Sequence, residues 1–122
     1  MVYKDLLDQI NTKVQSYQFM ELWITSFEAG KLIVNGSDDS SYYHNFQIVF
    51  SGVYVIAGAL EWCVPTEKQC IELGTKEEYA KLMYEYSGTA DLTVFKFNGD
   101  NLAPTFILAN SMEFIDKVQL YY

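Results

Sequence analysis

The sequence contains no arginine, a single histidine (His44) and none of the glycine-rich motifs that cradle phosphate groups. Its eight basic residues are all lysines, and sixteen aspartates and glutamates outnumber them, so the formal net charge is −8. Nucleic-acid binding needs lysine or arginine to neutralise phosphates, and anionic lipid surfaces attract the same positive charge. The composition therefore predicts that the chain binds neither nucleic acid nor membranes.

The single histidine also limits the catalytic mechanisms that are open to the chain. Serine and cysteine hydrolases need an imidazole that accepts and returns a proton near neutral pH. Any such mechanism would have to use His44, which strand alternation places on one face with Phe46, Ile48 and Phe50. A lone histidine on an apolar face is typical of a core or a strand edge. We therefore predict that the chain is not an enzyme and has no catalytic residue.

Two weaker chemical alternatives involve carboxylates. Asp38 and Asp39 lie close enough in sequence to His44 to fold back toward it, and two carboxylates with one imidazole are able to bind a divalent metal. No recognised ligand spacing supports that site, so we predict no metal and no cofactor. Glu61 follows the apolar run from Val53 to Leu60, where burial would raise its pKa. The simpler interpretation is that Glu61 marks a strand end and faces water.

Two cysteines and the first residues of the chain indicate the compartment. Cys63 and Cys70 are seven positions apart, which is not a zinc-ligand spacing, and no second pair completes four ligands. The first ten residues carry Asp5 and Asp8 where a signal peptide has a basic flank and an apolar stretch. We therefore expect a cytoplasmic protein with two buried free thiols, with a small disulfide-bonded loop as the alternative.

The 122 residues, half of them apolar, predict a single domain over residues 1–122 without a linker. Apolar residues at helical spacing predict a helix over 3–17. A hairpin closed by Ala29-Gly30 follows, with strands at 21–27 and 31–35, and a polar loop covers 35–41. In 42–60 we predict two strands that meet in a tight turn at Ser51-Gly52, with a bulge in one strand as the alternative.

The second helix has the best-defined start in the sequence. Thr75 and Glu78 have the spacing of a capping box, in which each residue's side chain accepts a hydrogen bond from the other's backbone amide. Gly88 is expected to end this helix, because glycine readily adopts the left-handed conformation that follows a helix.

Three strands complete the predicted fold, at 92–97, 105–109 and 113–121. The last of them would place Phe114, Val118 and Leu120 on one face. The predicted fold class is α+β, with two helices packed on a largely antiparallel, strongly twisted sheet of about six or seven strands.

Acidic and aromatic residues together form the strongest functional signal. Two carboxylates and two phenols lie in or beside the polar loop, and further glutamates lie between Pro65 and the second helix. Tyrosine supplies contact area at interfaces, and carboxylates pair with lysine or arginine across them. The predicted partner-binding residues are Asp38, Asp39, Tyr42, Tyr43, Glu67 and Glu72. The plainer alternative is that the tyrosines lie half-buried over the core and that the charge keeps the protein soluble.

The chain resembles the small immunity proteins that bacteria make in the cytoplasm against their own toxins. The resemblance lies in size, acidity, absent catalytic motifs, the order of a helix followed by strands, and the strand-like segment from His44 to Ile56. It implies inhibition by occlusion, in which carboxylates pair with the cationic active site or nucleic-acid groove of a basic protein partner. No residue roles are transferred from the resemblance.

Two other functions remain open at this level. The chain is rich enough in aromatic residues to form a small-molecule site, or an unconventional active site, in a pocket lined by Trp23, Trp62 and several tyrosines. An exposed strand edge would instead favour pairing with a second copy, so both a monomer and a homodimer are consistent with the sequence.

Overall fold

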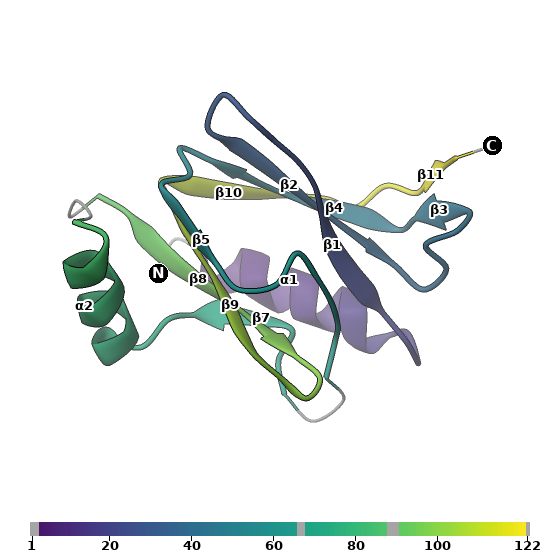
Figure 1. Ribbon diagram of the computed structural model, residues 1–122. Coiled ribbons are helices and arrows are strands. Elements are labelled where there is room, and N and C mark those ends of the chain that lie inside the picture. The colour runs from purple at the N-terminus through teal and green to yellow at the C-terminus, as the bar shows by residue number, and fades with distance from the viewer. Residues whose placement is uncertain (1–2, 66–67, 88–90, 122) are drawn as a thin grey trace.

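The computed structural model describes residues 3–65, 68–87 and 91–121. These residues form two helices and eleven strands, and every strand pair is antiparallel (Figure 1). The elements are α1 (Lys4–Gln15), β1 (Glu21–Glu28), β2 (Lys31–Ser37), β3 (Tyr43–His44), β4 (Phe46–Ser51), β5 (Val55–Ala57), β6 (Glu61–Cys63), β7 (Ile71–Leu73), α2 (Lys76–Glu85), β8 (Thr93–Gly99), β9 (Leu102–Ala109), β10 (Ser111–Ile115) and β11 (Gln119–Leu120). The predicted α+β class is confirmed, whereas the prediction of one sheet with six or seven strands is wrong.

The strands divide into three sheets. A five-stranded sheet has the order β10-β4-β2-β1-β6, a four-stranded sheet has the order β5-β9-β8-β7, and β11 pairs with β3 alone. The two larger sheets face one another across the core. The ring of Phe50 in β4 lies 5.1 Å from Phe95 and 5.9 Å from Phe97 in β8, measured between centroids. One buried apolar cluster therefore joins both sheets.

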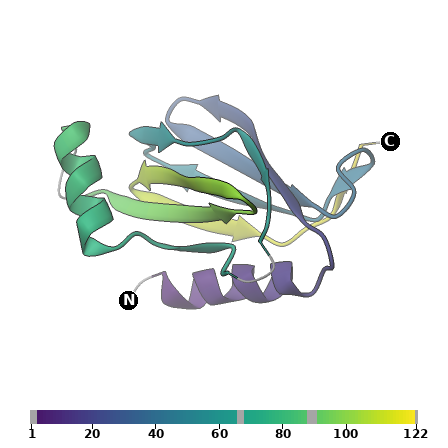
Figure 2. The same cartoon turned by 60° about the horizontal axis from the view of Figure 1, so that its bottom comes forward.

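Each helix covers a different part of this pair of sheets. Leu7, Ile10 and Val14 of α1 enter the main core, and α1 runs along one side of the two sheets (Figure 2). Leu82 of α2 packs with Val94 in a smaller cluster beside the four-stranded sheet. Neither helix in the described part of the chain has the length and apolar character needed to cross a membrane.

Local sequence signals predicted the helices and the first hairpin correctly. Ala29 and Gly30 both have positive φ angles, 53° and 77°, as a two-residue hairpin turn of this hand requires. Thr75 and Glu78 form the predicted capping box. The predicted helix end at Gly88 lies outside the described residues.

The segment around Ser51-Gly52 differs from the predicted turn. β4 ends at Ser51 in the five-stranded sheet, whereas β5 begins at Val55 in the four-stranded sheet, so the chain crosses from one sheet to the other. Gly52 has a φ of 63°, a conformation that glycine adopts without strain. A change of sheet depends on distant partners, so local sequence does not reveal it.

The predicted last strand, 113–121, is divided into β10 and β11. β10 pairs with β4, and β11 pairs with β3. Phe114 lies in β10, Leu120 lies in β11 and Val118 lies between them, so the three residues do not form one strand face. Val118 and Leu120 are exposed, whereas Phe114 is half-buried.

A buried side chain connects α1 to the open edge of β7. The Nδ2 of Asn11 donates to the Ile71 carbonyl at 2.9 Å, and the Ile71 amide donates to Asn11 Oδ1 at 3.0 Å. Asn11 thus provides the two hydrogen bonds that a further strand would provide at this edge.

We expect Asn11→Leu to lower the free energy of unfolding by about 2–4 kcal/mol, because it leaves two buried backbone groups of Ile71 unpaired. Urea denaturation measures the loss. Thr12→Ala, at the exposed next position of the same helix, is the matched control and should cost little. A loss for Asn11→Leu no larger than for the control would contradict this role.

Candidate functional site

A groove lies on the outer face of the five-stranded sheet, where β1 runs between β2 and β6. On β1, Leu22 points into the core opposite the buried Trp62, so Trp23 points outward. The groove has a volume of about 370 Å³ and is lined by Glu21, Trp23, Thr25, Asn35, Ser40, Glu61 and Tyr121. We call it the sheet groove. No lysine is among its lining residues.

Strand register places Trp23 at the middle of the sheet groove. Trp23 is directly opposite Asn35 on β2 and directly opposite Glu61 on β6. Glu21 lies two residues before Trp23, and therefore on the same face. The indole is half-buried, Glu21 is half-buried and Glu61 is exposed, so both carboxylates border an accessible aromatic ring. Glu61 faces water as expected, but it begins β6 and does not end the strand of the preceding apolar run.

The Cys63 thiol lies close to several carboxylates at this end of the sheet. Cys63 is opposite Glu21 in the β1–β6 register. Burial raises the pKa of the Cys63 thiol, and the negative charges of Glu21, Asp100 and Glu61 raise it further. Two of these three carboxylates, Glu21 and Glu61, also line the sheet groove.

A chain of polar side chains fixes the wall formed by Tyr121. The Nε2 of Gln47 donates to Asn35 Oδ1 at 2.9 Å, which leaves the Asn35 amide nitrogen to face the Tyr121 hydroxyl. The Tyr121 hydroxyl is 3.2 Å from Nδ1 of His44. This distance is a hydrogen bond, and the tautomer of the imidazole determines whether the hydroxyl or Nδ1 donates.

Burial shifts the pKa values of Tyr121 and His44 in opposite directions, and both shifts favour the neutral form. Burial raises the pKa of Tyr121, and the hydrogen bond from Asn35 lowers it, with a net upward shift. Burial also lowers the pKa of His44. The imidazole packs against the Tyr121 ring, with 5.7 Å between centroids. The prediction that His44 shares a face with Phe46 is wrong, because the two residues belong to separate strands.

The predicted binding loop borders the sheet groove. Asp38, Asp39 and Tyr42 are exposed between β2 and β3, Tyr43 is half-buried, and Ser40 of the same loop lines the groove. We call residues 38–43 the acidic loop. The structure thus brings four predicted binding residues together beside a groove that the sequence analysis did not find.

Hydrogen bonds hold the acidic loop in one shape. The Tyr43 hydroxyl donates to Asp38 Oδ1 at 2.8 Å, a bond that raises the pKa of Tyr43. The backbone amide of Asp38 donates to Asn45 Oδ1, and that of Asp39 donates to Ser37 Oγ, each at 2.9 Å. Within the described ranges, no three histidine, cysteine or acidic side chains are grouped as metal ligands.

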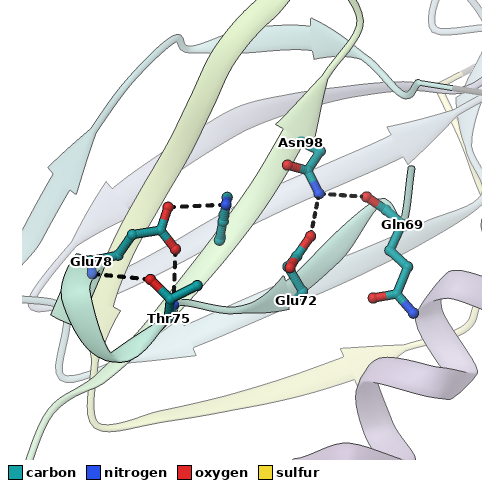
Figure 3. Close-up of polar contacts among 6 residues, drawn as sticks. Gln69, Glu72, Thr75, Glu78 and Asn98 are labelled. Carbon is teal, nitrogen blue, oxygen red and sulfur yellow. Dashed lines mark hydrogen bonds and ion pairs between the residues drawn. The ribbon is translucent and has the colours of Figure 1, made fainter. Parts of the chain in front are cut away.

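The other two predicted binding residues do not join the acidic loop. Glu67 lies outside the described residues. Glu72 lies on β7 of the other large sheet, where its Oε2 accepts a hydrogen bond from Asn98 Nδ2 at 2.7 Å (Figure 3). The same Asn98 nitrogen donates to the Gln69 carbonyl at 2.8 Å. Glu72 therefore stabilises the β7–β8 pair.

Glu78, near Glu72, also has a structural role. One carboxylate oxygen of Glu78 accepts from the Thr75 amide at 2.9 Å, as part of the capping box (Figure 3). The other oxygen is 3.0 Å from the Lys96 ammonium on β8. This ion pair ties the start of α2 to the four-stranded sheet.

The predicted aromatic pocket is not formed. Trp62 lies in the core, whereas Trp23 lies on the opposite face of the same sheet, so the two rings cannot line one pocket. Cys63 and Cys70 are both free, but only Cys70 is buried and Cys63 is half-buried. Burial raises the pKa of Cys70 to about 12. In comparisons with known proteins, no family model, curated protein or solved structure matches the chain.

We expect the pKa of His44 to lie below its ordinary value of 6.5. Tyr121→Ala removes the ring that packs against the imidazole and exposes it to water, so this variant should raise the pKa of His44 toward that value. Because the chain has one histidine, an NMR titration of its ring protons follows this group alone. Tyr54→Ala, at an exposed tyrosine beside the other large sheet, is the control. An unchanged pKa in Tyr121→Ala would contradict burial by Tyr121 as the cause.

We expect Glu78 to stabilise the fold only while it is ionised. Burial raises its pKa, but the Thr75 amide and Lys96 lower it more, so the folded pKa lies below 4.5. The stabilisation is therefore present above pH 4.5 and is lost as the pH falls through the folded pKa. Glu78→Gln should cost about 0.5–1 kcal/mol of unfolding free energy at neutral pH.

Urea denaturation at neutral and acidic pH measures this difference, which should shrink in acid. Glu77→Gln, an exposed neighbour on the same helix, is the control. A cost for Glu78→Gln that is equal at both pH values would show that ionisation is not the cause.

Proposed function

We propose that the chain is a non-enzymatic binding domain that covers a basic protein partner with the acidic loop and the sheet groove. The observation that carries the proposal is their continuity: Ser40 belongs to the loop and also lines the groove. Asp38 and Asp39 at the loop, and Glu21 and Glu61 at the groove, therefore belong to one acidic surface.

The chemistry of this surface suits a cationic protein. Carboxylates steer a basic partner and pair with its lysines and arginines, and complementary fields raise association rates by about 10–1000-fold. Trp23, Tyr42 and Tyr43 add aromatic side chains of the kind that is enriched at protein interfaces. The net charge of −8 extends this attraction beyond direct contact.

The surface is also built to change little on binding. The groove is formed by neighbouring strands, and hydrogen bonds hold the acidic loop. A preorganised surface loses less conformational entropy when it binds. Binding by occlusion, as in an immunity-type inhibitor, needs such a surface and no chemical step. His44 is buried against Tyr121, which favours a structural role for the single imidazole. We further propose that the protein acts in the cytoplasm, where its thiols stay reduced.

A deca-arginine peptide is a suitable probe of the proposed surface, with deca-glutamate as the negative control. We expect deca-arginine to bind and its affinity to fall steeply between about 50 and 300 mM salt, because screening weakens the attraction. The double variant Asp38→Asn/Asp39→Asn should weaken binding about tenfold, as measured by calorimetry. Asparagine keeps the oxygen that accepts from Tyr43, so the loop should retain its shape.

The matched control is Glu77→Gln/Glu85→Gln, which removes two charges from exposed positions on α2. If both double variants weaken deca-arginine binding equally, the effect comes from net charge alone, which would contradict the assigned surface. Absence of deca-arginine binding at low salt would contradict the proposed function itself.

A further inference from the structure

We infer that the sheet groove is the socket for one arginine side chain of the basic partner, with the guanidinium group over the Trp23 indole and between Glu21 and Glu61. This inference rests on the proposed function and names the group that the partner presents. It concerns the groove alone, whereas the acidic loop supplies the surrounding attraction.

The first support is the position of Trp23 between hydrogen-bonding neighbours. Glu61 is its direct cross-strand neighbour, and such neighbours have their Cβ atoms about 4.5–5.5 Å apart. Glu21 lies on the same face, two residues earlier on the same strand. A flat cation stacked on the indole would therefore have a carboxylate near its edge on two sides.

The second support is that both carboxylates lack a positive partner of their own. Within the described ranges, the ion pairs of the lysines involve Asp8, Asp116, Glu85 and Glu78. Neither Glu21 nor Glu61 has such a contact in this part of the chain, and no lysine lines the groove. Two uncompensated charges beside an accessible aromatic ring favour a cation from another molecule.

The third support is the shape and chemistry of the groove, which favour arginine over lysine. A guanidinium is planar, stacks on aromatic rings and presents five donors, whereas an ammonium is a compact point charge. The carboxylates of Glu21 and Glu61 and the hydroxyl oxygens of Thr25 and Ser40 are acceptors at the groove lining. A volume of about 370 Å³ is ample for one such side chain.

The fourth support is that the wall of the groove formed by Tyr121 is held in place. Tyr121 lines the groove, and its hydroxyl is fixed by His44 at 3.2 Å and by Asn35. The adjacent backbone is fixed as well, because the Tyr121 amide donates to the Tyr42 carbonyl at 2.9 Å. The socket is therefore present before the partner binds.

The test uses three five-residue peptides, glycine at every position except a central arginine, lysine or citrulline, with both ends blocked. Citrulline has nearly the shape of arginine but no charge. The indole N–H resonances of Trp23 and Trp62 are followed by NMR during titration and are assigned with Trp23→Phe. We expect the arginine peptide to shift the Trp23 signal saturably, the lysine peptide to bind more weakly, and the citrulline peptide to cause no saturable shift.

Variants identify the groove as the place of binding. Glu61→Gln and Trp23→Leu should each weaken the arginine peptide by about threefold or more. Glu113→Gln is the matched control, because Glu113 is exposed on β10 of the same sheet and does not line the groove. Since Glu61 is exposed, its substitution tests the socket even if Trp23→Leu fails to fold.

The outcomes separate this inference from the proposed function. If deca-arginine binds through Asp38 and Asp39 but Glu61→Gln has no effect on the arginine peptide, the socket is wrong and the binding surface stands. Equal binding of the arginine and citrulline peptides, or a shift of Trp62 in place of Trp23, would also overturn the socket. If no cationic peptide binds, the proposed function is overturned together with the inference.

Discussion

The two hydrogen bonds between the Asn11 side chain and the Ile71 backbone are the contact on which the arrangement of this protein depends. A helix has no free backbone groups along its side, so it ordinarily covers an apolar face and leaves a strand edge open. Here a side-chain amide from α1 reproduces a peptide group and covers that edge. Leu7, Ile10 and Val14 of the same helix close the core. Because α1 closes the core, the outer face of the five-stranded sheet is not needed for that purpose and carries the sheet groove.

That outer face is built by the same strands that build the core. On β1, Leu22 is fully buried while the next residue, Trp23, lines the groove. On β6, Trp62 is buried in the core between two outward residues, Glu61 and Cys63. The two tryptophans of the chain thus have different roles because they occupy opposite faces of one sheet. The packed core holds the groove side chains in place, because each strand carries core side chains on one face and groove side chains on the other.

The features that could be predicted were those encoded by neighbours in the sequence. The capping box at Thr75 and the Ala29-Gly30 turn are complete within a few residues, and so is the acidic loop. The groove is different, because Trp23 and Glu61 meet only through strand pairing and His44 meets Tyr121 across 77 positions. The hydrogen bond of Glu72 was missed for the same reason. Its charge is engaged by Asn98, 26 residues away, which no local pattern indicates.

The β3–β11 pair holds the last described residues of the chain beside the sheet groove. β11 has only two residues, all of 115–121 is exposed, and yet Tyr121 forms part of the groove. The described chain begins far from that wall, at the opposite end of the molecule (Figure 1). A purification tag or fluorescent label attached after β11 would therefore crowd the groove. The same addition before α1 would leave the groove clear, which makes the amino terminus the better anchoring point for immobilising this protein on a sensor surface.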